Sequence, residues 1–283
     1  LPIEEVVQSL REEDGGLACR RTLESLRGLL AELEGGGEEP IVLATFHRVA
    51  AEFHRQVGPA ASFYRHILRF LSLTPLDSIE ATERVAIATD LAQAALVSEE
   101  VHDLGTVATH PILEYLSASP EKGWVADLVL ATQQGDVERF ATAYASHEDE
   151  VAAEHEALAA SLDTVKEKVA LAAVVEAVAR RPAADRSVPL RDIAKAAYRD
   201  DDLERDEGAL SLLTQRLLMR GMSLGLIRGR IDQVEEIVHI DYVRPRVLDD
   251  AGIDRIQAQI EAWVHKVHAA AIQVEDGAAE VLA

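Results

Sequence analysis

The chain has 283 residues, of which 48% are hydrophobic, which is enough for a core spread over about two domains or one extended helical array. It carries 28 basic and 50 acidic residues, and its net charge of −22 disfavours nucleic acid and anionic membranes as partners and favours proteins. The single cysteine, Cys19, excludes an internal disulfide and fits a reducing compartment. No apolar run reaches the roughly 18 residues of a membrane span, so no membrane partner is expected.

Helical periodicity dominates the first 181 residues, and aromatic residues make up only 4% of the chain. Glycine and proline separate the periodic stretches, for example at Pro75, Pro120 and Gly135. We expect helices over 2–12, 17–34, 41–57, 59–73, 77–97, 101–118, 122–134, 136–146 and 149–180. Because the loops are short, consecutive helices must pack as antiparallel neighbours, so residues 1–181 are predicted to form an α-solenoid or bundle. The chain begins with Leu1 inside a helical pattern, so we expect an N-terminal part to precede it.

Residues 182–248 have a different pattern, which favours a winged helix-turn-helix. Two helix-like stretches, SVPLRDIAKAAY and DEGALSLLTQRLLMRGMSLGLI, precede two β-like runs, LIRGRI at 226–231 and EIVHI at 236–240. Two helices followed by a hairpin is the order of a winged helix. Gly225 is well placed to end the second helix in a left-handed turn. The alternative is that two helices and a hairpin are adjacent without forming this fold.

Residues 249–283 are predicted to form a C-terminal helix and tail, with Asp249 or Asp250 as the N-cap. Apolar residues recur there at alternating spacings of three and four, which is a heptad pattern: Ile253, Ile256, Ile260, Trp263, Val267, Ala270 and Val274. Burying the five large side chains from Ile253 to Val267 would contribute on the order of 10 kcal/mol, at about 2 kcal/mol each, so the row needs a cover. It can pack on the winged helix of its own chain, or join a bundle with helices from other chains.

The winged helix raises the question of nucleic-acid binding, because its second helix commonly enters the major groove. Residues 187–248 contain ten basic and eleven acidic side chains, whereas a groove reader carries a clear positive excess. Arg216 and Arg220 share a helix face, and Arg228 and Arg230 share one side of a strand, but the acidic run RDDDLERDE at 199–207 directly precedes the second helix. We therefore expect no nucleic-acid partner.

A zinc site is conceivable at 146–156, because this stretch holds His147, Glu148, Glu150, Glu154 and His155. The spacing does not match the HExxH arrangement, so a charged face of a surface helix is the simpler interpretation. The chain has no glycine-rich phosphate loop after a strand and no nucleophile elbow, and Cys19 has no local base. We therefore expect no catalytic residues, no metal and no cofactor.

A helical array, a winged helix and a terminal helix, in that order, resemble the PCI-domain family, a module shared by the proteasome lid, the signalosome and a translation initiation complex. Within the family the similarity is greatest to one subunit of the proteasome lid. It rests on the segments ASFYRHILRFL (61–71), HPILEYL (110–116), GDVERF (135–140), SLGLIRGRIDQVEEIVHI (223–240) and VRPRVLD (243–249). The last two segments, in tandem before a heptad helix, are the specific ones.

This resemblance implies a non-catalytic scaffold of the cytoplasm and nucleus. Its partners would be the other PCI lid subunits, the deubiquitinase subunits and the neighbouring ubiquitin-receptor subunit, in a hetero-oligomer. We expect winged helices to pack edge to edge and terminal helices to share a bundle. The interface residues are then predicted to be Ile253, Ile256, Ile260, Trp263, Val267, Arg228, Arg230, Arg244 and Arg246.

The two arginines that flank Pro245 are expected to contact carboxylates or backbone carbonyls where the wing meets the tail, not phosphate. The alternatives are a PCI scaffold of the signalosome or of an initiation factor, where RNA contact fits better, and a winged-helix transcription regulator.

Overall fold

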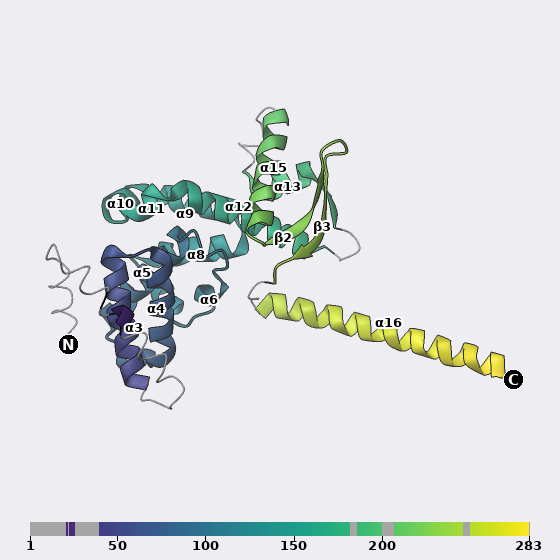
Figure 1. The fold of residues 1–283 in the computed structure, drawn as a ribbon, viewed down its shortest axis with the longest axis horizontal. Helices are drawn as coiled ribbons and strands as arrows, with labels where there is room; N and C mark the ends of the chain where they lie inside the picture. Colours follow the sequence, from purple (N-terminus) through teal and green to yellow (C-terminus); the bar gives the residue numbers. More distant parts are fainter. Residues whose placement is uncertain are drawn as a thin grey trace. The chain divides into compact units, whose positions relative to one another are not determined.

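Figure 1 shows the chain in a computed structural model, which describes residue 21 and residues 23–25, 40–181, 186–199, 207–245 and 250–282. The chain divides into two compact units, Leu1–Pro245 and Arg246–Ala283. The first unit holds a helical array followed by a small three-stranded sheet with its helices, and the second holds one long helix. These elements confirm the predicted fold class, an all-α array followed by a winged helix and a terminal helix.

Helices α3 (Pro40–Val57) and α4 (Ala60–Leu73) form an antiparallel pair, as the sequence predicts. Only Gly58 and Pro59 connect them, so the chain reverses at once and the two helices pack on each other. The predicted helix 2–12 and most of 17–34 lie outside the described residues.

The next helices are α5 (Ala81–Val97), preceded by the 3-10 turn η1 (Leu76–Ser78), and the short helices α6 (Gly105–Ala108) and α7 (Ile112–Ser117). A single helix over 101–118 is therefore wrong. Pro111 lacks an N–H group and disfavours helical backbone in the residue before it. The Nδ1 atom of His110 instead accepts a hydrogen bond of 3.1 Å from the backbone nitrogen of Ile112.

Helix α8 (Gly123–Gln134) ends at Gly135, and α9 (Val137–Ser146) begins at Asp136, close to the predicted boundaries. Gly135 has a φ of 72°, a left-handed conformation that glycine adopts without strain. The side chain of Asp136 caps α9 by accepting a hydrogen bond of 2.9 Å from the backbone nitrogen of Arg139.

One predicted helix over 149–180 is three helices in the structure: α10 (Glu148–Glu154), α11 (Glu156–Ala160) and α12 (Leu162–Ala179). The first break falls at His155, whose φ of −128° and ψ of 49° are not helical. The break turns His155 and Leu158 inward, so that they are 7% and 1% exposed. The apolar spacing is helical on both sides of the break, so the sequence pattern gives no sign of it.

The helical array is held together by aliphatic side chains from several helices. Leu96 of α5, Leu116 of α7 and Leu128 of α8 are fully buried in one cluster, and Val165 and Val169 of α12 join it. This cluster fixes α12 against the array and so positions the module that follows.

The module that follows contains β1 (Ser187–Pro189), α13 (Leu190–Ala197), α15 (Glu207–Ser223), β2 (Ile227–Asp232) and β3 (Ile237–Val243). Its strands form an antiparallel sheet in the order β1-β3-β2, which leaves β1 and β2 at the two edges. Both predicted strands are confirmed. The sequence did not predict β1, which is only three residues long and runs straight into α13.

Helix α15 ends as the sequence predicts, at Gly225, whose φ is 68°. The backbone nitrogen of Gly225 donates to the carbonyl oxygen of Met222, and that of Leu226 donates to Gly221, both at 3.0 Å. These two bonds form a Schellman motif, which satisfies carbonyl groups that the end of a helix otherwise leaves unpaired. The motif turns the chain directly into β2.

The winged helix has its own hydrophobic core, to which α12 contributes. Val174 and Val178 of α12 pack with Ile193 of α13, Leu218 of α15 and Val238 of β3. Helix α12 therefore belongs to both cores and leads from the array into the winged helix (Figure 1). The predicted domain boundaries at residues 181 and 248 stay predictions.

Helix α16 (Asp250–Leu282) has 33 residues and makes up the described part of the second unit. At a rise of about 1.5 Å per residue, a helix of this length extends for about 50 Å.

Candidate protein-interaction surfaces

The heptad residues of α16 are exposed. The five predicted as interface residues range from 42% exposed for Ile256 to 66% for Trp263. We call the whole row the α16 ridge: Ile253, Ile256, Ile260, Trp263, Val267, Ala270 and Val274. Val264 and Ile272 are also exposed large apolar residues, at 53% and 45%, and the strict spacing of three and four did not include them. The helix thus presents a continuous apolar row of the kind that another helix covers.

The exposed side of β2 carries two of the other predicted interface residues, Arg228 and Arg230. They alternate with Ile227 and Ile231, which belong to the core side of the sheet. The guanidinium of Arg228 lies 5.1 Å from the ring centroid of Tyr242, its cross-strand partner. A cation–π contact of this kind holds Arg228 in place on an edge strand while its donor groups stay accessible.

The exit from the winged helix carries the last two predicted interface residues. Arg244 is exposed, and its backbone nitrogen donates a hydrogen bond of 2.8 Å to the carbonyl oxygen of Leu226, which fixes the chain just beyond β3. Arg246 lies outside the described residues. The contacts predicted for these two side chains remain predictions.

Some basic residues of the winged helix are paired within the chain. The Nε atom of Arg220 on α15 lies 2.9 Å from Oε1 of Glu167 on α12, and Arg199 lies 3.2 Å from Glu138 on α9. These pairs offset the positive charge of Arg220 on α15 and of Arg199 after α13. The apolar side chains of Leu212 and Met219, which are 66% and 56% exposed, lie on the same helix and suit a protein partner better than a phosphate backbone.

A buried lysine, which the sequence analysis missed, joins two helices of the array. Lys168 of α12 is 4% exposed, and its Nζ atom donates hydrogen bonds to the carbonyl oxygens of Ala95, Leu96 and Ser98 at the end of α5. Burial lowers the pKa of its ammonium group to about 7. Its sequence position gave a signal, because Lys168 lies three residues after Val165 and one before Val169, on an apolar face.

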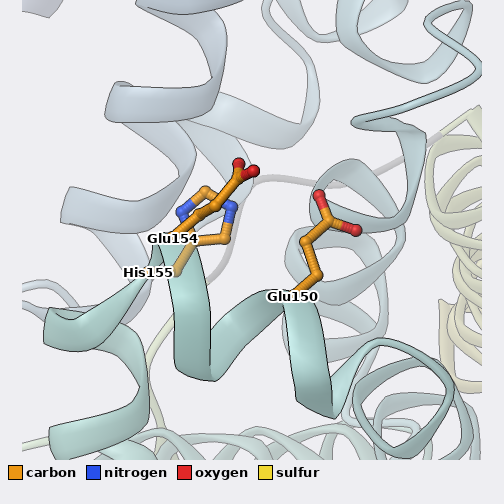
Figure 2. Close-up of side chains that lie close together, drawn as sticks. All are labelled: Glu150, Glu154 and His155. Atoms are coloured by element: carbon orange, nitrogen blue, oxygen red, sulfur yellow. The ribbon is translucent and has the colours of Figure 1, made fainter.

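The stretch considered for zinc brings only part of its residues together. Figure 2 shows Glu150, Glu154 and His155, which offer one ligand atom each, all within 4.8 Å of one another. His147 lies elsewhere: its ring stacks on Trp124 at 5.0 Å, and its Nδ1 lies 3.0 Å from the carbonyl oxygen of Ala143. Lys122, the residue before α8, contacts both carboxylates, at 3.4 Å from Glu150 and 2.6 Å from Glu154.

Comparison with known proteins identifies relatives over most of the chain. Residues 9–129 match the family described as PSD13 N-terminal repeats. The 26S proteasome non-ATPase regulatory subunit 13 of Dictyostelium discoideum is 32% identical over 266 residues, which are 94% of this chain and 65% of that protein. The chain is therefore similar to proteasome regulatory subunit 13 over most of its own length. The resemblance predicted from its segments is thereby confirmed.

Two further relatives carry related names. The 26S proteasome non-ATPase regulatory subunit 13 homolog B of Arabidopsis thaliana is 29% identical over 258 residues, which cover 91% of this chain and 63% of that protein. The 26S proteasome regulatory subunit RPN9 of Saccharomyces cerevisiae is 28% identical over 226 residues, which cover 79% of this chain and 53% of that protein. The chain thus spans between half and two thirds of the length of these subunit 13 relatives.

The match to the PSD13 repeats falls on the helical array, because residues 9–129 include α3, α4, α5, α6, α7 and most of α8. The longer matches to the subunit 13 relatives extend over most of the chain. Among the described helices, none is long and apolar enough to cross a membrane.

Proposed function

We propose that this chain is a non-catalytic structural subunit of the lid of the 26S proteasome regulatory particle. The observation that carries the proposal is its similarity, over 94% of its length, to a protein named as proteasome regulatory subunit 13. In this role the chain binds proteins and no substrate or cofactor. It supports the ATP-dependent degradation of ubiquitinated proteins by positioning other subunits, and it acts in the cytoplasm and the nucleus.

Assembly depends on two surfaces with different physical character. The α16 ridge is apolar and 42% to 66% exposed at its five predicted interface residues, so a bundle with helices of other subunits would remove a large apolar area from water. The edge strand β2 of the winged helix presents Arg228 and Arg230, whose guanidinium groups suit carboxylates or carbonyl oxygens of a neighbouring winged helix. Burial of the α16 ridge would provide most of the binding free energy, and the two arginines would set how the neighbouring winged helix is aligned with β2.

The partners proposed for these surfaces are the other PCI subunits of the lid, the deubiquitinase subunits and the neighbouring ubiquitin-receptor subunit. Arg244 and Arg246 would add charge-assisted contacts where the winged helix leads into α16. The α16 ridge remains open to a second arrangement, in which it packs on the winged helix of its own chain.

Copurification tests the proposal. A tagged form of the chain, expressed in the cells from which it comes, should retain the proteasome ATPases and the deubiquitinase. Recovery of deneddylase subunits or ribosomes instead would place it in the signalosome or in an initiation complex. A gel-shift titration with duplex DNA at increasing salt completes the test, because salt-sensitive binding is the property of a winged-helix transcription regulator.

A further inference from the structure

A buried imidazole and two carboxylates meet where α10 ends and α11 begins. Glu150 and Glu154 are four residues apart on α10, which places them on one face of the helix. His155 follows immediately, and one atom of each of the three side chains lies within 4.8 Å of the others. Figure 2 shows both carboxylates on the same side of α10 as the imidazole ring.

The non-helical backbone at His155 makes this grouping possible. On a continuous helix, adjacent residues such as Glu154 and His155 point about 100° apart. Here the helix ends at Glu154, and the φ and ψ of His155 turn its ring back toward the array. The sequence pattern predicts an uninterrupted helix here and lacks the HExxH spacing. For these two reasons, no metal was expected at this place.

The imidazole of His155 supplies a second, independent observation. The residue is 7% exposed, and its Nε2 atom is buried without a hydrogen-bond partner among the residues that the structure describes. Its other nitrogen, Nδ1, lies 2.5 Å from Nε2 of Gln93 on α5. The two nitrogens of an imidazole diverge, so Nε2 points away from α5, and Figure 2 shows a ring nitrogen on the side of the carboxylates. A buried polar atom without a partner is rare in proteins and indicates a ligand or ion that completes it.

The charges favour a dication at this place. The ammonium of Lys122, which contacts both carboxylates, leaves one net negative charge among the three groups. A divalent ion would neutralise the two carboxylates in full once the ammonium of Lys122 has moved away. The side chain of Lys122 is 24% exposed, so its ammonium can move into water when an ion enters.

We propose that Glu150, Glu154 and His155 bind one divalent transition-metal ion, with Zn²⁺ as the best match. One imidazole nitrogen and two carboxylate oxygens are ligands that Zn²⁺ accepts, whereas Mg²⁺ and Ca²⁺ take oxygen ligands alone. Water would complete a four-coordinate site. The ion links α10 to His155 at the junction with α11. It takes the place of the Lys122 ammonium group between the two carboxylates.

The surroundings of His155 suit a metal ligand. When Nε2 binds the ion, Nδ1 carries the proton and donates it to a hydrogen bond. The amide of Gln93 can receive it by turning its oxygen toward the ring, which is the usual outer support of a metal-bound histidine.

Trp124 offers a local reporter, because its ring centroid lies 5.5 Å from that of His155. The chain has two tryptophans, so Trp263→Phe leaves Trp124 as the only one. In this background, metal-free protein is titrated with Co²⁺, which quenches nearby tryptophan fluorescence. We expect saturation at one ion per chain, and recovery of the fluorescence when Zn²⁺ displaces Co²⁺.

Variants locate the site. Glu154→Gln and His155→Gln should each weaken Co²⁺ binding at least about tenfold, because even the outer support of a metal ligand commonly contributes 10- to 100-fold, roughly, to affinity. Lys122→Met should tighten binding by removing the competing cation. His147→Gln is the matched control, since His147 stacks on Trp124 but lies outside the cluster, and it should leave binding unchanged.

Two results would overturn the proposal: quenching that does not saturate, or binding that survives unchanged in both Glu154→Gln and His155→Gln. The Glu154 side chain is 60% exposed, so Glu154→Gln should keep the fold even where His155→Gln does not, and circular dichroism verifies this.

Discussion

The Nζ atom of Lys168 on α12 donates a hydrogen bond of 2.7 Å to the carbonyl oxygen of Leu96, near the end of α5. It also donates to the carbonyl oxygens of Ala95 and Ser98, so one buried side chain serves the end of a helix whose last carbonyls have no partner in the helix itself. This contact joins two helices that are about seventy residues apart in the sequence. It therefore helps to fix α12, on which the winged helix is built.

Replacing Lys168 with methionine tests this contact. Lys168→Met keeps a long apolar stem but leaves three buried carbonyl oxygens without their donor, so the free energy of unfolding should fall by about 2 to 3 kcal/mol. Urea unfolding followed by circular dichroism measures the change. Lys166→Met, on the exposed side of the same helix, should change stability by less than about 0.5 kcal/mol. Equal effects of the two substitutions would refute the role of Lys168.

The same residue predicts how stability depends on pH. The pKa of Lys168 is about 7 in the folded chain, compared with 10.5 for an unperturbed lysine. Below pH 7, both states hold the proton, whereas between the two pKa values the unfolded state binds more protons, so stability rises with pH. From pH 7 to pH 9, the free energy of unfolding should increase by about 2 kcal/mol more in the wild type than in Lys168→Met. Identical pH profiles for the two proteins would contradict this assignment.

Gly135 and Gly225 both have left-handed backbone, but only Gly135 is closely packed. Substituting each by alanine therefore distinguishes the cost of backbone strain from the cost of a steric clash. Gly135 has a φ of 72°, and a Cβ atom there would lie 2.5 Å from the Cα of Ala173 on α12. Gly225 has a φ of 68°, but a Cβ atom there would meet no atom of the described residues within 4 Å. We expect Gly225→Ala to cost about 1 kcal/mol from backbone strain alone. Gly135→Ala should cost at least about 3 kcal/mol, because backbone must also move. Thermal unfolding measures the stability of both variants. Similar losses of stability would show that α12 is not closely packed against Gly135.

The arginines of β2 provide a prediction about assembly that does not depend on stability. Arg228→Glu with Arg230→Glu should reduce incorporation into the proteasome, because the proposed neighbour presents acceptor groups. Both side chains are exposed, so the unfolding curve should barely change. Arg191→Glu, a charge reversal at an exposed position on α13, is the control. Quantitative copurification gives the answer, and equal incorporation of all three proteins would remove β2 from the interface.

Much of the fold could be predicted because particular residue types mark where helices begin and end. Gly135 and Asp136 separate α8 from α9, and Gly225 ends α15, since each has a conformation or a side-chain bond that other residue types do not readily supply. The α16 ridge could be predicted from spacing alone, because a heptad pattern gives both the helix and its apolar side.

The remaining features depend on tertiary contacts that spacing does not record. The break at His155 interrupts a helical pattern that continues on both sides. The spacing therefore named Glu150, Glu154 and His155 as zinc candidates but could not show that these three meet without His147. Strand β1 has three residues and is defined by its pairing with β3. Pro111, in contrast, indicates a helix break within 101–118, and the prediction of a single helix there did not take it into account.

The proposal that α16 joins helices of other subunits is tested most directly by charging the ridge. Ile256→Asp with Ile260→Asp should leave the helical circular dichroism spectrum in place but prevent copurification with the proteasome, because burying two carboxylates in an apolar bundle is costly. Ala258→Asp with His265→Asp adds the same number of carboxylates away from the ridge and should incorporate normally. Normal incorporation of the Ile256 and Ile260 variant would contradict the account.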